Sequence, residues 1–267
     1  MLAAMLGSLL LATAPAPVEQ PVAIPAAGGV TLAGTLTLPA GAGPHPAAVL
    51  VSGFGPSRRD GSFEGTGGPY ADLAAALARR GVAVLRYDKR GLGESGGPAL
   101  SWLDARPLVR DAVAAVRALI GTPGVDRARV ALIGHSQGGD LALAAAPSTG
   151  ATRVVTLSAP GRPLGQLPRV TGTARRFLDR LVGPDAARAT LRTDPRPAAA
   201  RVRAPVLMVH GTRDRTVPLQ DMRALAAARS AAGRTTRTVT VPRAGHFLEV
   251  DGRVPPAAIR AVADFVS

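Results

Sequence analysis

The sequence contains no cysteine. Disulfides, a thiolate nucleophile, a cysteine-ligated metal and a lipidated amino-terminal cysteine are therefore excluded, although the redox compartment stays open. Aromatic residues are also scarce, at 3% of the chain, and Lys89 is the only lysine among the 32 basic residues, which leaves 31 arginines. So one-sided a use of arginine is typical of a coding bias that runs through a whole genome.

Acidic residues are few as well, so the 267-residue chain carries a formal net charge of +14. A basic protein can bind nucleic acid or an anionic membrane surface through its arginines. Here the arginines are scattered, aromatic stacking residues are rare, and no nucleic-acid-binding motif occurs. We therefore expect no nucleic-acid partner.

The amino-terminal residues MLAAMLGSLLLATAPAP form an apolar run that is too short to span a bilayer. Small residues at 12–14 and a proline at 15 resemble a signal-peptidase site, so we expect residues 1–16 to be a signal peptide that is cleaved after Ala14 or Ala16. That predicts a secreted or periplasmic protein with no stable membrane span. Because no lysine or arginine precedes the run, an uncleaved anchor or a disordered tail on a cytoplasmic protein stays open.

Residues 17–267 are expected to form one domain, because 46% of the chain is hydrophobic and no repeat or long linker divides it. Two β-rich stretches, 21–25 and 30–38, flank Gly28-Gly29 and predict an antiparallel hairpin. Apolar strand runs then alternate with helical stretches, which indicates a mostly parallel α/β sheet of about eight strands flanked by helices. The strands are expected at 47–51, 82–87, 130–133, 154–157, 206–209 and 238–241, and the helices at 70–80, 107–120, 137–146, 219–232 and 256–265.

The stretch 162–203 breaks this alternation, because it is rich in proline and has no strand-like run. We expect it to be a small helical lid over the strand ends, with one helix near 174–182. It holds ten arginines against three aspartates, so its charge of +7 is half of the net charge of the chain. Such a lid could steer anionic esters toward a site, but an ordinary solvated basic face is the simpler interpretation.

The strongest motif is Gly134-His135-Ser136-Gln137-Gly138, which lies between a predicted strand and a predicted helix. A sharp strand-to-helix turn would hold the serine in a strained conformation and expose its hydroxyl, and the flanking glycines would allow close approach of the backbone. Ser136 is therefore the candidate nucleophile. The alternative is an ordinary loop serine.

A serine hydroxyl needs a base within hydrogen-bonding reach, and the chain offers four histidines. His45 lies in a Pro-His-Pro turn, His135 is next to the nucleophile and His210 ends a buried strand, which leaves His246, on a loop after the last strand. The orienting acid is expected at Asp214, on the turn after the strand at 206–209. A surface histidine and a helix-capping aspartate are the alternatives.

A tetrahedral intermediate also needs two backbone N–H donors for its oxyanion. The first is expected from Gln137, the residue that follows the nucleophile. The second is expected from Phe54, in the loop Ser52-Gly53-Phe54-Gly55 after the strand at 47–51. The two glycines of this loop would let the amide of Phe54 approach, although they also suit an ordinary turn.

Together with the segments 52–56, 59–61, 87–95 and 210–218, the serine motif resembles the α/β-hydrolase superfamily, in particular its bacterial esterase or prolyl-oligopeptidase-like (serine aminopeptidase-like) branch. The resemblance covers nearly the whole chain after residue 16. It implies acyl transfer without a cofactor, through an acyl-enzyme on Ser136. In the segment 87–95, Asp88 and Arg90 are expected to form a structural ion pair.

The oxyanion loop of that branch usually begins Gly-Ser-Gly-Pro, whereas here Phe54 takes the central position. A bulky ring beside the acyl pocket predicts a preference for short acyl chains. The expected function is hydrolysis of a small carboxylic ester, with a peptidase, amidase or thioesterase on the same triad as the alternative. A binding protein without chemistry would require a broken triad, and no metal cluster is visible. The oligomeric state is not determined by the sequence.

Overall fold

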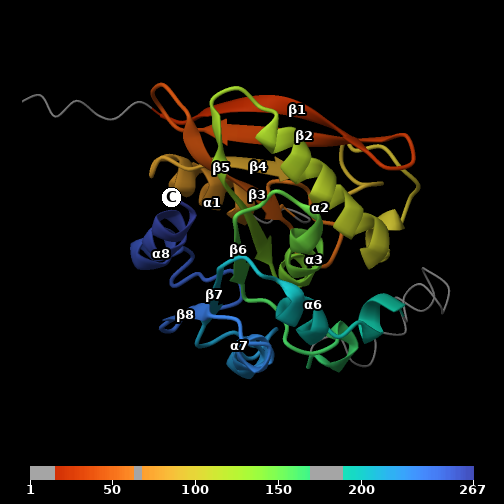
Figure 1. Cartoon of the computed structure of the whole chain (residues 1–267), viewed down its shortest axis with the longest axis vertical. Helices are drawn as coiled ribbons and strands as arrows, with labels where there is room; N and C mark the ends of the chain where they lie inside the picture. Colours follow the sequence, from red (N-terminus) through yellow and green to blue (C-terminus); the bar gives the residue numbers. More distant parts are fainter. Residues whose placement is uncertain (1–15, 63–67, 169–188) are drawn as a thin grey trace, which may run out of the picture.

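The computed structural model of the chain describes residues 16–62, 68–168 and 189–267. Within these ranges one eight-stranded sheet runs in the order β1-β2-β4-β3-β5-β6-β7-β8, with helices on both faces (Figure 1). The predicted α/β fold class is confirmed. The strands are β1 (Val18–Ala26), β2 (Val30–Leu38), β3 (His45–Val51), β4 (Ala83–Tyr87), β5 (Val125–His135), β6 (Arg153–Leu157), β7 (Val206–Gly211) and β8 (Thr236–Val241). The main helices are α1 (Pro69–Ala78), α2 (Ala105–Ile120), α3 (Gln137–Ala145), α6 (Arg196–Arg201), α7 (Leu219–Ala231) and α8 (Pro256–Val266).

The predicted hairpin forms one edge of the sheet. Strands β1 and β2 pair antiparallel from Val18 opposite Leu38 to Ala26 opposite Val30, so β1 is longer than the sequence suggested. Gly28 and Gly29 turn the chain with φ values of 79° and 69°, a region in which a side chain would be strained. Strand β2 then pairs antiparallel with β4, which joins the hairpin to the parallel part of the sheet.

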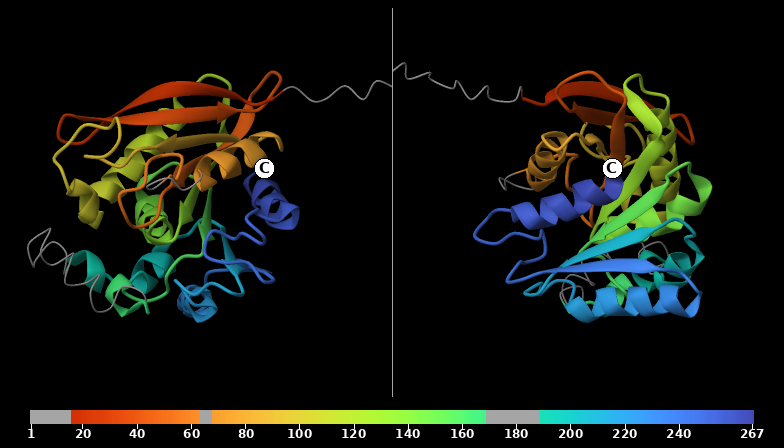
Figure 2. Two further views of the ribbon diagram at one scale, coloured as in Figure 1. Left: turned by 180° about the vertical axis from the view of Figure 1, so that it is seen from behind. Right: turned by 60° about the vertical axis from the view of Figure 1, so that its left-hand side comes forward.

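The central parallel strands β3, β6 and β7 are buried on both faces, which explains why they are mainly apolar, whereas the edge strand β8 is largely exposed. In β3, Ala47 and Val49 pack on the face that α2, α3, α6 and α7 cover. Ala48 and Leu50 point the other way, into the core beneath α1 and α8. The right-hand view of Figure 2 shows α8 on one side of the sheet and α7 beneath the other. The sheet thus separates two hydrophobic cores. The carboxyl ends of its parallel strands lie at one edge, where the turns that follow them can form a site.

The turn after β4 corrects one expectation, because Asp88 and Arg90 do not pair with each other. Arg90 donates from Nε to the Asp111 carboxylate on α2 at 2.7 Å, and Asp111 is fully buried. Asp88 instead accepts from the backbone and the side chain of Arg59, at 2.7 Å each, and from the Glu94 amide at 3.0 Å. A buried carboxylate requires a cation or several donors, and each of these two takes the donors nearest to it.

Two predicted segments fall largely outside the described residues. Residues 1–15 of the predicted signal peptide and residues 169–188 of the predicted lid, with its helix near 174–182, are among those the structure does not describe. The flanks of the lid are described, and they include a short 3-10 turn at Leu164–Gln166 and helix α6. Signal peptide and lid therefore stay predictions.

Candidate active site

The serine motif forms the turn between β5 and α3. Ser136 joins them with φ 53° and ψ −127°, a left-handed conformation that few residues other than glycine adopt. A Cβ on Gly134 would lie 2.1 Å from the Gly138 carbonyl oxygen, and one on Gly138 would lie 2.1 Å from the Val51 carbonyl oxygen. Only glycine fits at these two positions. The turn is thus held by close backbone contacts, and Ser136 lines a pocket.

Asp214 and His246 meet at the same edge of the sheet, from the turns after β7 and β8. The His246 Nδ1 lies 2.8 Å from the Asp214 Oδ2. The other carboxylate oxygen accepts from the backbone amides of Thr216 and Val217, at 2.8 and 2.9 Å. Burial alone would raise the pKa of Asp214, but the hydrogen bond and charge of His246 and the two amides outweigh it and lower this pKa. Asp214 is therefore held as a carboxylate that orients the imidazole.

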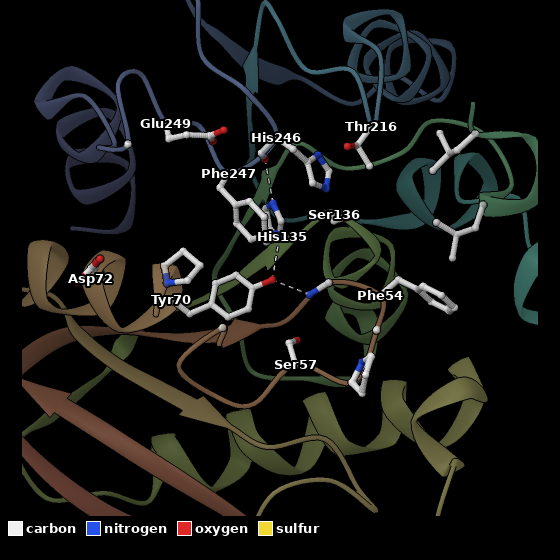
Figure 3. A pocket seen from close by; sticks show the side chains of 18 of the residues that line it. Phe54, Ser57, Tyr70, Asp72, His135, Ser136, Thr216, His246, Phe247 and Glu249 are labelled. Atoms are coloured by element: carbon white, nitrogen blue, oxygen red, sulfur yellow. Dashed lines mark hydrogen bonds between the residues drawn. The ribbon is translucent and has the colours of Figure 1, made fainter. Parts of the chain in front are cut away.

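His246 and Ser136 line the same pocket and lie close together in Figure 3. Among the described residues, the Ser136 hydroxyl makes no hydrogen bond, to His246 or to any other group. Hydrogen bonds between nucleophile and base are often loose without substrate and tighten when it binds. The structure thus brings together the three residues that the sequence singled out as nucleophile, acid and base.

His210 stands behind the acid. Its Nε2 donates to the Val217 carbonyl at 2.9 Å and lies 3.5 Å from the Asp214 carboxylate. Burial lowers the pKa of His210, so the ring stays neutral and acts as a donor to the turn. This agrees with leaving His210 aside as a base, and it gives the residue a structural role in the acid turn.

The loop after β3 passes directly beside Ser136, the candidate nucleophile. A Cβ on Gly53 would lie 3.0 Å from the Ser136 Cβ, so this glycine permits the approach. Phe54, the expected oxyanion donor, lines the pocket, and Gly55 turns the loop with φ 112°. The other expected donor, Gln137, opens α3, where the first amides of a helix have no partner within it. Phe54 and Gln137 thus belong to the loop and the helix that adjoin Ser136, and their role as oxyanion donors stays a prediction.

Tyr70 and His135 connect this loop to the loop of the base. The Gly53 amide donates to the Tyr70 hydroxyl at 3.0 Å, and that hydroxyl lies 2.8 Å from the His135 Nδ1. The His135 Nε2 lies 3.0 Å from the His246 carbonyl, which can only accept. Nε2 therefore carries the proton, and Nδ1 accepts from Tyr70 (Figure 3).

The His135 ring also stacks on Phe247, with centroids 4.6 Å apart and planes inclined by 22°. Burial, followed by the nearby charge of His246, lowers the pKa of His135 to about 3, while burial raises the pKa of Tyr70. Neither residue was among those that the sequence predicted for the site. The position of His135 inside the serine motif was a signal, whereas nothing in the sequence marked Tyr70.

The pocket has a volume of about 720 Å³ and a mainly apolar lining. Phe54, Leu164, Leu167 and Leu191 form its wall on one side of Ser136, and Tyr70 and Phe247 line the other side. Its charged side chains are Asp72 and Glu249, and no arginine or lysine is among the described lining residues. The described wall thus lacks the cations that an anionic ester would require.

In the described part of the chain, no three histidine, aspartate or glutamate side chains gather as metal ligands. A search of the same residues finds no helix with the length and apolarity needed to cross a bilayer.

Comparison with known proteins identifies similar hydrolases. Residues 63–194 match the family described as serine aminopeptidase, S33. The chain is 37% identical over 136 residues to the esterase EstD of Thermotoga maritima, in a match that covers 51% of this chain and 32% of that protein. The chain spans less than two thirds of the length of the curated relatives it matches.

Solved structures share the fold at low sequence identity. The Pyrococcus furiosus esterase Pf2001 superposes with a TM-score of 0.73 at 18% identity, covering 94% of this chain and 91% of that one. The Pyrococcus horikoshii acylaminoacyl peptidase superposes with a TM-score of 0.71 at 17% identity, covering 94% of this chain and 41% of that one. Esterases and peptidases thus carry the same fold.

Proposed function

We propose that the chain is a serine hydrolase of the α/β-hydrolase superfamily and that it cleaves carboxylic esters. The observation that carries the proposal is the 2.8 Å contact between His246 and Asp214 in the pocket that also holds the strained Ser136. A neutral hydroxyl becomes a nucleophile when such a base removes its proton. The likeness to an esterase supports esters as substrates.

In the proposed reaction, the Ser136 Oγ attacks the ester carbonyl carbon while the His246 Nε2 takes the hydroxyl proton. The carbonyl oxygen becomes an oxyanion, which the amides of Phe54 and Gln137 stabilise. Asp214 balances the positive charge on the imidazolium. The tetrahedral intermediate then expels the alcohol, which takes the proton from His246 and leaves an acyl-enzyme. Water repeats the sequence, releases the acid and restores the serine.

We propose a neutral substrate with a short acyl chain. A pocket of about 720 Å³ has room for both the acyl and the alcohol part of a small ester, and its lining suits apolar groups. The Phe54 ring packs near Leu164, Leu167 and Leu191, which limits the space for an acyl chain on that side. Removing this ring is therefore expected to admit longer chains.

A second candidate is a peptidase or amidase, and one observation favours it. The Asp72 and Glu249 carboxylates line the pocket beyond Tyr70 and Phe247, away from Phe54 (Figure 3). A carboxylate there would attract the ammonium group of an amino-acid substrate. A thioesterase would use the same triad, but no feature of the pocket favours it over an ester.

Hydrolysis of p-nitrophenyl esters from acetyl to dodecanoyl, together with fluorophosphonate labelling, tests the proposal. Ser136→Ala should lower the turnover by at least about 10⁴-fold and abolish labelling, because no nucleophile remains. Ser148→Ala, at an exposed serine, is the matched control and should retain both turnover and labelling.

Phe54→Ala should shift the optimum to longer acyl chains. Faster cleavage of aminoacyl p-nitroanilides than of all esters would favour the peptidase, and wild-type protein without turnover or label would contradict both.

We also propose export of the chain, on the signal-like pattern of residues 1–16. Expression in a bacterial host, cell fractionation and amino-terminal sequencing test this. A periplasmic or secreted product that starts after Ala14 or Ala16 is expected, and a cytoplasmic product that retains Met1 or Leu2 would contradict it.

A further inference from the structure

Lys89 is a buried lysine beside the loop Ser52-Gly53-Phe54-Gly55, which is the expected oxyanion loop. It follows β4, and only 2% of its surface is exposed. Its ammonium group donates to the carbonyl of Gly53 and to the carbonyl of Gly55, the latter at 3.0 Å. These two residues flank Phe54 in the chain, so one side chain holds the loop on both sides of the expected oxyanion donor.

Burial of this ammonium is costly. Desolvation lowers the pKa of Lys89 to about 7, and none of the ion pairs among the described residues involves this side chain. An apolar side chain would fill the same space without that cost. A position with only a packing role would therefore not favour a lysine, and the two carbonyl contacts are the evident compensation.

The occurrence of a lysine at position 89 also indicates a role beyond packing. The chain uses arginine at 31 of its 32 basic positions, and the exception is this one. A guanidinium group is a wide planar fork, whereas an ammonium group is a compact centre whose donors can converge on two carbonyls in a small space. The site thus selects lysine for its shape, against the strong preference of the chain for arginine.

Peptide geometry connects these contacts to the reaction. The Gly53 carbonyl and the Phe54 N–H belong to one planar trans peptide, so they point in opposite directions. Because Lys89 holds the carbonyl on one side, the N–H is aimed to the other side. The Gly53 amide is fixed as well, through the Tyr70 hydroxyl at 3.0 Å. Hydrogen-bond donation to the carbonyl end also polarises the peptide and strengthens its N–H as a donor.

We propose that Lys89 is a positioning residue that aims and polarises the Phe54 amide toward the oxyanion of the tetrahedral intermediate. The inference rests on the proposed acyl transfer at Ser136. Lys89 itself touches neither the nucleophile nor the substrate in this scheme and acts through the Gly53–Phe54 peptide. Its loss should therefore reduce stabilisation of the transition state more than binding of the substrate.

The test compares Lys89→Met, Lys89→Gln and Lys89→Arg with Arg229→Met, using kcat per fluorophosphonate-titrated active site. Arg229 is the matched control, because it is also buried and donates to backbone carbonyls, those of Ala199 and Val202 at 2.9 Å, but lies on α7 away from the pocket. Lys89→Met should lower kcat about 10- to 100-fold with KM changed less than about threefold, a fraction of what a lost oxyanion donor costs. Lys89→Gln, which keeps donors, should lose less than Lys89→Met, and Lys89→Arg should not restore the rate.

Affinity for a trifluoromethyl ketone, which forms a tetrahedral oxyanion adduct on the serine, should fall by the same factor as kcat/KM in each Lys89 variant. Arg229→Met should lose thermal stability but keep kcat per titrated site within about twofold. A Lys89→Met enzyme with wild-type kcat per site, or with losses matched by Arg229→Met, would overturn the positioning role.

The wild-type protein offers a second readout that does not depend on a variant folding. Because Lys89 is the only lysine, Nζ-specific ¹⁵N-lysine labelling gives a single side-chain signal. Adduct formation with the ketone should shift that signal, and Ser136→Ala should show no shift. An unchanged signal in a fully formed adduct would contradict the proposal. Wild-type protein that neither hydrolyses esters nor reacts with fluorophosphonate would overturn the proposed function, and the role of Lys89 with it.

Discussion

The two loops that flank the pocket are held in different ways. The turn of Ser136, the candidate nucleophile, is held by its own residues, since Gly134 and Gly138 allow backbone contacts that hold Ser136 at φ 53°. In the loop after β3, which is expected to supply an oxyanion donor, the side chains of Tyr70 and Lys89 hold Gly53 although they are distant in the sequence. A motif can be recognised where the constraint is local. Where the constraint comes from elsewhere in the fold, only the structure reveals it.

A substitution at Gly138 tests whether local backbone contacts hold the turn of Ser136. The Cβ of a Gly138→Ala variant would lie 2.1 Å from the Val51 carbonyl oxygen, so the backbone must shift. We expect a loss of at least about 3 kcal/mol of stability and loss of fluorophosphonate labelling. Chemical denaturation and labelling measure the two effects. Gly121→Ala, at a helix end with φ −78°, is the control and should change stability by less than about 1 kcal/mol. Equal behaviour of the two variants would refute the constraint.

Asp214→Asn should be the next largest change. The Asn oxygen can still accept from the Thr216 and Val217 amides, which turns the side-chain NH₂ toward the His246 Nδ1. That ring nitrogen must then accept, so Nε2 carries the proton and cannot act as the base. Ester hydrolysis is expected to fall about 10³- to 10⁴-fold at nearly unchanged stability. Asp126→Asn, at an ion pair with Arg129 away from the pocket, should leave the rate unchanged. A loss below tenfold in Asp214→Asn would remove it from the triad.

His135→Gln tests the link between the two loops through pH. The pKa of His135 is about 3 in the folded protein and about 6.5 when unfolded, so between these values the unfolded state binds more protons. Stability therefore falls as the pH drops below about 6.5, by about 2 to 3 kcal/mol at pH 4.5. Glutamine cannot protonate, so this part of the pH dependence should disappear in the variant. Unfolding free energies at about pH 7 and about pH 4.5 measure it, and equal slopes for both proteins would show that His135 is protonated in the fold.

Tyr70→Phe should give the smallest change in activity. It tests whether distant side chains hold the loop after β3. The variant loses the acceptor for the Gly53 amide and the donor to His135, whereas the contacts of Lys89 with the Gly53 and Gly55 carbonyls remain. We expect kcat to fall about tenfold, in line with the loss of one or two hydrogen bonds, with KM nearly constant. Tyr87→Phe, at the other tyrosine of the chain, is the matched control. A larger rise in KM than fall in kcat would place Tyr70 in substrate binding instead.

Much of the fold could be predicted because its signals are local. The alternation of apolar strands with helical stretches predicted the parallel sheet, and Gly28-Gly29 predicted the hairpin. Boundaries were less certain, because strand β5 runs from Val125 to His135 although only the apolar segment 130–133 in its second half was evident. Helix α2 begins two residues before the expected Pro107, where the Asp104 side chain caps it by accepting from the Arg106 amide at 3.0 Å. The resemblance to α/β-hydrolases is confirmed by the comparisons.

The site divides in the same way. Ser136, Asp214 and His246 could be singled out because each follows a strand in a recognisable turn, and parallel strands bring such turns to one edge. The prediction that Asp88 pairs with Arg90 was wrong, because residues that are neighbours in the sequence can have nearer partners in space. The catalytic roles of Ser136, Asp214 and His246 stay predictions until the variants are measured.

By itself, the sequence determined the fold class, the strained serine turn and the order of the candidate nucleophile, acid and base, because backbone sterics and strand periodicity act over a few residues. Only the tertiary structure decided that Tyr70, His135 and Lys89 join the oxyanion loop to the rest of the site. The physical reason is distance along the chain. Hydrogen bonds reach about 3 Å whatever the sequence separation, so their partners are set by how the sheet and its helices pack.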